Sequence, residues 1–165
     1  MSLDALMLPL LDAELFATLS PAQLKTVALC AERRSRSKGD VIIRAGEDSD
    51  AAILLMNGSL QAWPEEIGVG VATQVTPGTL LSEMAMFTET RHTYTVVAAS
   101  NVHLLYFFRD DIEALLEREP ALAESLMSGF SLQLEGLVEA LRAADAQLEA
   151  AINGDARAPA ETKAA

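Results

Sequence analysis

Two neighbouring stretches, residues 77–87 and 91–96, carry the groups in this chain best suited to hold a small ligand. The first reads as a turn and a short helical crossing, and the second leads into a β-strand. Backbone amides at the start of a helical turn attract anions such as phosphate. Glu83 lies beside those amides, and a carboxylate accepts hydrogen bonds from sugar hydroxyls but repels phosphate. The layout therefore suits a ligand with hydroxyls at one end and a phosphate at the other.

Two side chains that can carry positive charge, Arg91 and His92, precede the strand. A guanidinium holds two phosphate oxygens with a fixed fork of donors. An imidazole gains its charge only as the pH falls. Because successive strand residues face opposite sides, a slip of one position matters. Either a looped backbone turns Arg91 inward, or His92 meets the phosphate, or neither does.

These residues resemble the phosphate-binding cassette of cyclic nucleotide-binding domains, which occur in catabolite-activator-type regulators, cyclic-nucleotide-dependent kinases and gated channels. The family pattern runs roughly Phe-Gly-Glu-Leu-Ala-Leu, a short loop, and then Arg-x-Ala-Thr-Val. The positions that match it are Glu83, Met84, Ala85, Met86, Thr95 and Val96. Further likeness covers residues 15–21, 38–47 and 57–60, so that the resemblance extends over about residues 15–145.

Two positions depart from the pattern. Ser82 stands where the family prefers glycine, so that its side chain either crowds the ligand or adds a hydroxyl to the site. His92, four residues before Val96, takes the usual arginine position, and Arg91 comes one residue earlier.

The resemblance implies a binding site for cAMP or cGMP. Glu83 would accept a hydrogen bond from the ribose 2′-hydroxyl, and the amides of Met84 and Ala85 would hold the cyclic phosphate. Arg91 or His92 would neutralise it. The candidate ligand-binding residues are therefore Ser82, Glu83, Met84, Ala85, Arg91, His92 and Thr93. The predicted C-terminal helix, residues 120–152, would cover the base with the pair Leu137-Val138. Because both side chains are apolar, they leave the choice of base open.

The composition limits the other possibilities. With 165 residues, half of them apolar, the chain fits one domain with a sizeable core. It has no apolar run of the roughly 18 residues that a membrane span needs and no evident signal peptide. Its single cysteine, Cys30, suits a reducing compartment, so we expect a cytoplasmic protein. A net charge of −12 argues against nucleic acid as a partner, because a duplex-binding surface needs positive charge.

The chain divides into four segments. Residues 1–31 are a helical segment, 32–108 a β-roll core, 109–152 two helices, and 153–165 a tail that we expect to be disordered. Regular short strands separated by turn signals, Gly68 among them, favour an antiparallel β-roll or jelly roll. The predicted strands are 41–44, 51–56, 60–63, 70–75, 94–98 and 102–108.

The long C-terminal helix is predicted from Pro120 to Ile152, with Asn153-Gly154 as its stop. Apolar residues recur along it by threes and fours in a heptad pattern, at Met127, Phe130, Leu134, Leu137, Leu141, Ala144, Leu148 and Ala151. This pattern favours a parallel homodimer. Gly129 and Gly136 are expected to weaken the helix, each by about 1 kcal/mol relative to alanine, or to mark a bend.

Catalysis is not expected, because we find no nucleophile paired with a base. Two histidines and one cysteine provide no metal-ligand cluster, so neither a metal nor a cofactor is predicted. We expect no helix-turn-helix domain in the residues that follow the long helix. Two hypotheses remain: a sensory module that binds a cyclic nucleotide, or a degenerate relative that binds none and serves in dimerisation or protein docking.

Overall fold

The computed structural model describes residues 3–64 and 70–155, so the predicted turn at Gly68 lies outside the described residues. The helices are α1 (Leu3–Asp12), α2 (Pro21–Cys30), α3 (Arg109–Arg118) and α4 (Pro120–Asp155), with short 3-10 helices η1 (Glu14–Phe16) and η2 (Glu83–Met86). The strands are β1 (Glu32–Arg36), β2 (Val41–Ile43), β3 (Asp48–Ser49), β4 (Ala51–Asn57), β5 (Leu60–Pro64), β6 (Thr73–Val75), β7 (Leu80–Leu81), β8 (Thr90–Arg91), β9 (Tyr94–Ala98) and β10 (Val102–Phe108).

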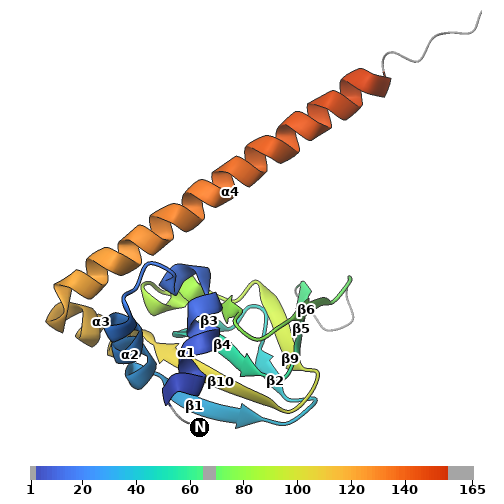
Figure 1. Ribbon diagram of the computed structural model, residues 1–165. Coiled ribbons are helices and arrows are strands. Elements are labelled where there is room, and N and C mark those ends of the chain that lie inside the picture. Colours follow the sequence, from blue (N-terminus) through green and yellow to red (C-terminus); the bar gives the residue numbers. More distant parts are fainter. Residues whose placement is uncertain (1–2, 65–69, 156–165) are drawn as a thin grey trace, which may run out of the picture. The chain divides into compact units, whose positions relative to one another are not determined.

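The strands form an antiparallel β-roll, which confirms the predicted fold class (Figure 1). One sheet has the order β1-β10-β4-β7, a second has the order β2-β9-β5-β6, and β3 pairs with β8 alone. Each described strand pair is antiparallel. The strands predicted at 94–98 and 102–108 have the bounds observed for β9 and β10.

The main apolar core lies inside the roll and draws on both four-stranded sheets. Ile53 and Leu104 contribute from the first sheet, and Leu60 and Val96 from the second. All four side chains are 4 % exposed or less. Tyr94, the first residue of β9, packs against the margin of this core.

The short helices pack on the outside of the first sheet, where α1 contacts β4 and α3 contacts β10. Helix α2 begins with a capping box: the Ser20 hydroxyl accepts from the Gln23 amide, while the Gln23 side chain accepts from the Ser20 amide. Phe16 lies with its ring centroid 5.5 Å from that of Phe107. This contact joins the N-terminal helical segment to the first sheet.

The first part of α4 packs closely on the N-terminal helical segment. The Thr18 hydroxyl donates to the Ser125 carbonyl at 2.7 Å, and the Gln23 amide donates to the Ser125 hydroxyl at 3.0 Å. A Cβ at Gly129 would lie 2.4 Å from the Leu15 carbonyl oxygen. Gly129 therefore permits a close backbone approach, a reason for glycine that the sequence did not reveal.

Residues 130–155 form a separate unit that consists of the rest of α4. The helix continues through Asn153 and Gly154 to Asp155, so the predicted stop at Asn153-Gly154 is wrong. Asparagine and glycine lower helix propensity without removing a backbone hydrogen bond, unlike proline. No helix among the described residues combines the length and the apolar character needed to cross a membrane.

Candidate ligand-binding site

The cassette begins where β7 ends and turns at Ser82 into η2. Ala85 and Met86 are buried and anchor η2 against β4, α3 and β10. Met84 is 50 % exposed. The Ala85 amide donates to the Ser82 carbonyl at 2.9 Å, which closes the first turn of the crossing. The short helical crossing expected from the sequence is therefore present as a 3-10 turn.

Ser82 has a left-handed backbone, with φ 55° and ψ 40°. Within residues 3–64 and 70–155 it is the one non-glycine residue with positive φ. Such a conformation suits glycine because a Cβ crowds the backbone there. The position where the family pattern has glycine thus has a backbone conformation that favours glycine, while its side chain supplies a hydroxyl.

The Ser82 side chain lies at the centre of a small hydrogen-bonded cluster. Its Oγ is 3.0 Å from His92 Nδ1 and 3.2 Å from the Tyr94 hydroxyl. The Ser82 amide donates to the same Tyr94 hydroxyl at 3.1 Å. We call these three residues the serine cluster: Ser82, His92 and Tyr94. Their contacts hold the start of the crossing against the start of β9.

His92 is half-buried, and its backbone is fixed on the turn after β2. Its carbonyl accepts from the Gly46 amide at 2.8 Å, and its amide donates to the Glu47 carbonyl at 3.0 Å. Burial lowers the pKa of the His92 imidazole, partly opposed by the charges of Glu47 and Asp50. The ring is therefore a mainly neutral group near pH 7 that an adjacent anion would help to protonate.

Arg91 points away from this cluster. It lies opposite Asp48 in the β3–β8 pair, and its Nε is 2.8 Å from the Asp48 carboxylate, with the two side chains 74 % and 82 % exposed. Together they line a polar cleft of about 520 Å³ whose lining includes no member of the serine cluster. The alternation expected along a strand thus separates Arg91 from His92.

The other candidate residues divide between the cassette and the surface. Glu83 begins η2 and is half-buried. Thr93 is exposed, between His92 and β9. The structure therefore brings Ser82 and His92 into contact, while Arg91 and Thr93 lie on the exposed side of the β8–β9 segment.

Tyr94 is a site residue that the sequence prediction missed. The sequence predicts it only as the first residue of a strand, yet its hydroxyl contacts both the amide and the Oγ of Ser82. The signal was present in the pattern, since Thr95 and Val96 align with Thr-Val and place Tyr94 where the pattern has alanine. An alanine side chain could not reach the start of the crossing.

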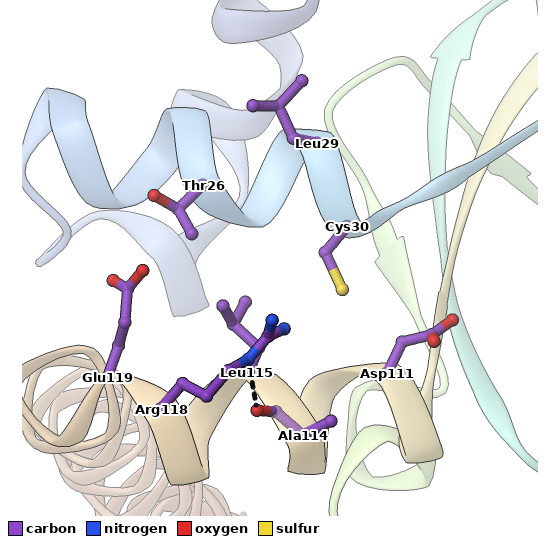
Figure 2. Close-up of a pocket in the computed structure, with 8 residues that line it drawn as sticks. All are labelled: Thr26, Leu29, Cys30, Asp111, Ala114, Leu115, Arg118 and Glu119. Carbon is purple, nitrogen blue, oxygen red and sulfur yellow. Dashed lines mark hydrogen bonds between the residues drawn. The ribbon is translucent and has the colours of Figure 1, made fainter.

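A different cavity, of about 550 Å³, lies between α2 and α3 and is shown in Figure 2. Cys30 lines it together with Asp111 and Arg118. Burial raises the pKa of the Cys30 thiol, and the charge of Asp111 raises it further. A thiol with a raised pKa is a poor nucleophile, so this cavity does not provide a reactive cysteine. No cluster of metal-binding side chains occurs among the residues that the structure describes.

Comparison with known proteins identifies the class. The sequence profile of the cyclic nucleotide-binding domain family matches residues 33–119, more than half of the chain. This chain therefore belongs to the cyclic nucleotide-binding domain family, as its resemblance to the cassette pattern suggested.

Particular relatives define its neighbourhood in the family. It is 32% identical over 111 residues to a cyclic nucleotide-gated potassium channel of Mesorhizobium japonicum, covering 67% of this chain and 30% of the channel. It is 28% identical over 137 residues to the cyclic AMP receptor protein of Thermus thermophilus, covering 82% of this chain and 60% of the receptor. The chain thus spans less than two thirds of either relative.

A solved structure adds the same fold with a ligand present. The regulatory domain of Toxoplasma gondii PKA, crystallised with cAMP, matches 68% of this chain and 43% of that chain, with 25% identity and a TM-score of 0.61. The names of these relatives describe a receptor, a channel and a regulatory domain.

Proposed function

We propose that this protein is a non-enzymatic sensory module that binds a cyclic nucleotide, cAMP or cGMP, in the cassette around Ser82. The main observation in its favour is the left-handed turn at Ser82, with Glu83 at the start of η2 and a half-buried His92 in contact with the turn. The cAMP-bound relative supports the proposed ligand. The relatives, whose names describe a receptor, a channel and a regulatory domain, support a binding role over a catalytic one.

Each candidate residue receives a role in this proposal. Glu83 accepts from the ribose 2′-hydroxyl, and the amides of Met84 and Ala85 face the cyclic phosphate. The Ala85 amide, which donates to the Ser82 carbonyl at 2.9 Å, must give up that bond to reach the phosphate. His92 is favoured over Arg91 as the phosphate partner, because His92 already touches Ser82 Oγ, whereas Arg91 is held by Asp48. Thr93 is an additional donor. Binding also takes up a proton, since a phosphate beside His92 favours the imidazolium.

The proposal is tested by a thermodynamic cycle between Glu83 and the ribose. Calorimetry would measure binding of cAMP and of 2′-deoxy-cAMP to the native protein and to the Glu83→Ala variant. A hydrogen bond to a carboxylate contributes about 1.5–3 kcal/mol, so either single change should weaken binding about 10-fold or more. The two changes together should cost little more than one.

Glu89→Ala is the matched control, because Glu89 is an exposed carboxylate on the loop after η2. It should leave both affinities unchanged. Additive losses for Glu83→Ala and the missing hydroxyl would remove Glu83 from its role. No heat from cAMP or cGMP at millimolar concentration would reject nucleotide binding altogether.

The alternative is a degenerate domain that binds no nucleotide and serves in dimerisation or docking. It is favoured by the exposed Arg91–Asp48 pair, since no guanidinium then faces the turn at Ser82 in the described cassette. The calorimetric experiment separates the two functions. A dimer that never binds nucleotide would support the alternative.

We further infer that the second part of α4 associates with a second copy of itself. Leu134, Leu137, Leu141 and Leu148 are each 57–62% exposed and follow the heptad spacing of a coiled coil. Burying a leucine contributes about 1.5–3 kcal/mol, so one such row on each chain can support a homodimer.

Sedimentation of Leu137→Glu against Leu132→Glu tests this association. Leu132 is 59 % exposed and Leu137 is 57 % exposed, but Leu132 lies on the opposite side of the helix from the row. We expect a dimer for the native chain and Leu132→Glu, and a monomer for Leu137→Glu. Equal behaviour of the two variants would contradict the proposed interface.

The partners and location follow from charge and cysteine content. A net charge of −12 favours a small molecule and a second copy as partners, and disfavours nucleic acid and anionic membranes. The single, half-buried Cys30 suits a reducing compartment such as the cytoplasm.

A further inference from the structure

The Tyr94 hydroxyl is hydrogen-bonded to the backbone N–H of Ser82, at the start of the cassette. It accepts from the Ser82 amide at 3.1 Å and lies 3.2 Å from Ser82 Oγ. A backbone N–H makes one good hydrogen bond at a time. While the phenol holds this amide, an oxygen of a bound ligand cannot use it.

The sheet holds the phenol in this place. Tyr94 begins β9 and lies opposite Pro64 of β5, and its ring packs against the main apolar core. The ring is therefore fixed at its base, and its hydroxyl reaches the turn without a mobile loop. A contact anchored in this way is present before any ligand arrives.

The Ser82 side chain is also engaged in hydrogen bonds within the serine cluster. Ser82 Oγ lies between the Tyr94 hydroxyl and His92 Nδ1, at 3.2 and 3.0 Å. These three residues thus bond to one another at the start of the crossing. A ligand oxygen that takes the Ser82 amide or its Oγ replaces one of these bonds.

We propose that Tyr94 is a built-in competitor of the ligand, a specificity-determining residue whose phenol oxygen stands in for a ligand oxygen at the Ser82 amide. This inference rests on the proposed function, because it concerns the affinity of the same cassette. Tyr94 thereby weakens nucleotide binding, because the nucleotide must displace the phenol from the Ser82 amide before it can bind there. A ligand that makes no bond to this amide leaves the phenol in place and does not compete with it.

The test compares Tyr94→Phe with Tyr106→Phe in calorimetry with cAMP. The chain has two tyrosines. Tyr106 is buried in β10 with its ring beside Arg34 and is not a member of the serine cluster, so its substitution is a matched control. Phenylalanine keeps the ring that packs on the core and removes the competing oxygen. A neutral hydrogen bond contributes about 0.5–1.5 kcal/mol, so Tyr94→Phe should bind cAMP about 2- to 13-fold more tightly, and Tyr106→Phe should bind as the native protein does.

A second measurement follows the phenol itself. With ring-labelled tyrosine, the nuclear magnetic resonance signal of Tyr94 Cζ should shift on addition of cAMP, and that of Tyr106 should not. Unchanged or weaker binding by Tyr94→Phe, or a Tyr94 signal that stays constant at saturation, would overturn the competitor role.

The outcomes also separate this inference from the proposed function. If the native protein is silent and Tyr94→Phe binds cAMP, the competitor role stands and nucleotide sensing by the native chain fails. If the native protein binds and Tyr94→Phe binds no better, sensing stands and the competitor role fails. If neither binds, both are rejected.

Discussion

The backbone at Ser82 gives a sharp test of the cassette geometry. Ser82 has φ 55° and ψ 40°, a conformation that costs a residue with a Cβ roughly 1–2 kcal/mol and costs glycine nothing. Comparing Ser82→Gly with Ser82→Ala isolates this cost, because both variants lose the same hydroxyl.

The magnitude follows from three contributions. Both variants lose the Oγ contacts to His92 and Tyr94, about 0.5–1.5 kcal/mol for each bond. Alanine keeps the left-handed strain, while glycine removes it but adds about 0.5–1 kcal/mol of unfolded-state freedom. We therefore expect both variants to be less stable than the native protein, and Ser82→Gly to be more stable than Ser82→Ala by about 0.5–1 kcal/mol.

Urea denaturation at one fixed protein concentration measures these free energies of unfolding. The same two substitutions at Ser128, which is exposed on α4, provide a control. There Ser128→Ala should be more stable than Ser128→Gly, because alanine favours a helix over glycine by about 0.8–1.0 kcal/mol. If Ser82→Ala were as stable as Ser82→Gly or more stable, the left-handed turn would be refuted as the basis of the cassette.

Three further predictions concern packing, charge and pH. Gly129→Ala should destabilise the fold by about 1 kcal/mol or more, because its Cβ would meet the Leu15 carbonyl, whereas Gly136→Ala, with open space around it, should stabilise α4 by about 1 kcal/mol in thermal unfolding. Arg91→Ala should change the unfolding free energy by less than about 1 kcal/mol, since its ion pair is exposed. Burial lowers the pKa of His92, so the unfolded chain binds its proton first. Stability should therefore fall as the pH drops below about 6.5, and less steeply in His92→Gln; equal slopes would contradict this assignment.

The sequence predicted the roll because its longer strands carry strong local signals. Strands β9 and β10 are rich in β-branched and aromatic residues and end at polar turns, so their bounds were predicted correctly. The two-residue strands β3, β7 and β8 could not be predicted, because two residues have no periodicity.

The site was predicted less completely, because its contacts join residues 10 to 12 positions apart. The pattern marked Ser82 and His92 as unusual but could not show that they touch. The choice between Arg91 and His92 depended on which side of the β8–β9 segment each faces. The β3–β8 register, which pairs Arg91 with Asp48, fixes that orientation and is set by tertiary structure.

A crystal structure with saturating cAMP is the most direct test of cyclic nucleotide binding. We expect the cyclic phosphate beside the Met84 and Ala85 amides and His92, the ribose 2′-hydroxyl on Glu83, and the Tyr94 hydroxyl displaced from the Ser82 amide. A cassette without nucleotide density, in which Tyr94 still accepts from Ser82 as it does here at 3.1 Å, would contradict the proposed function.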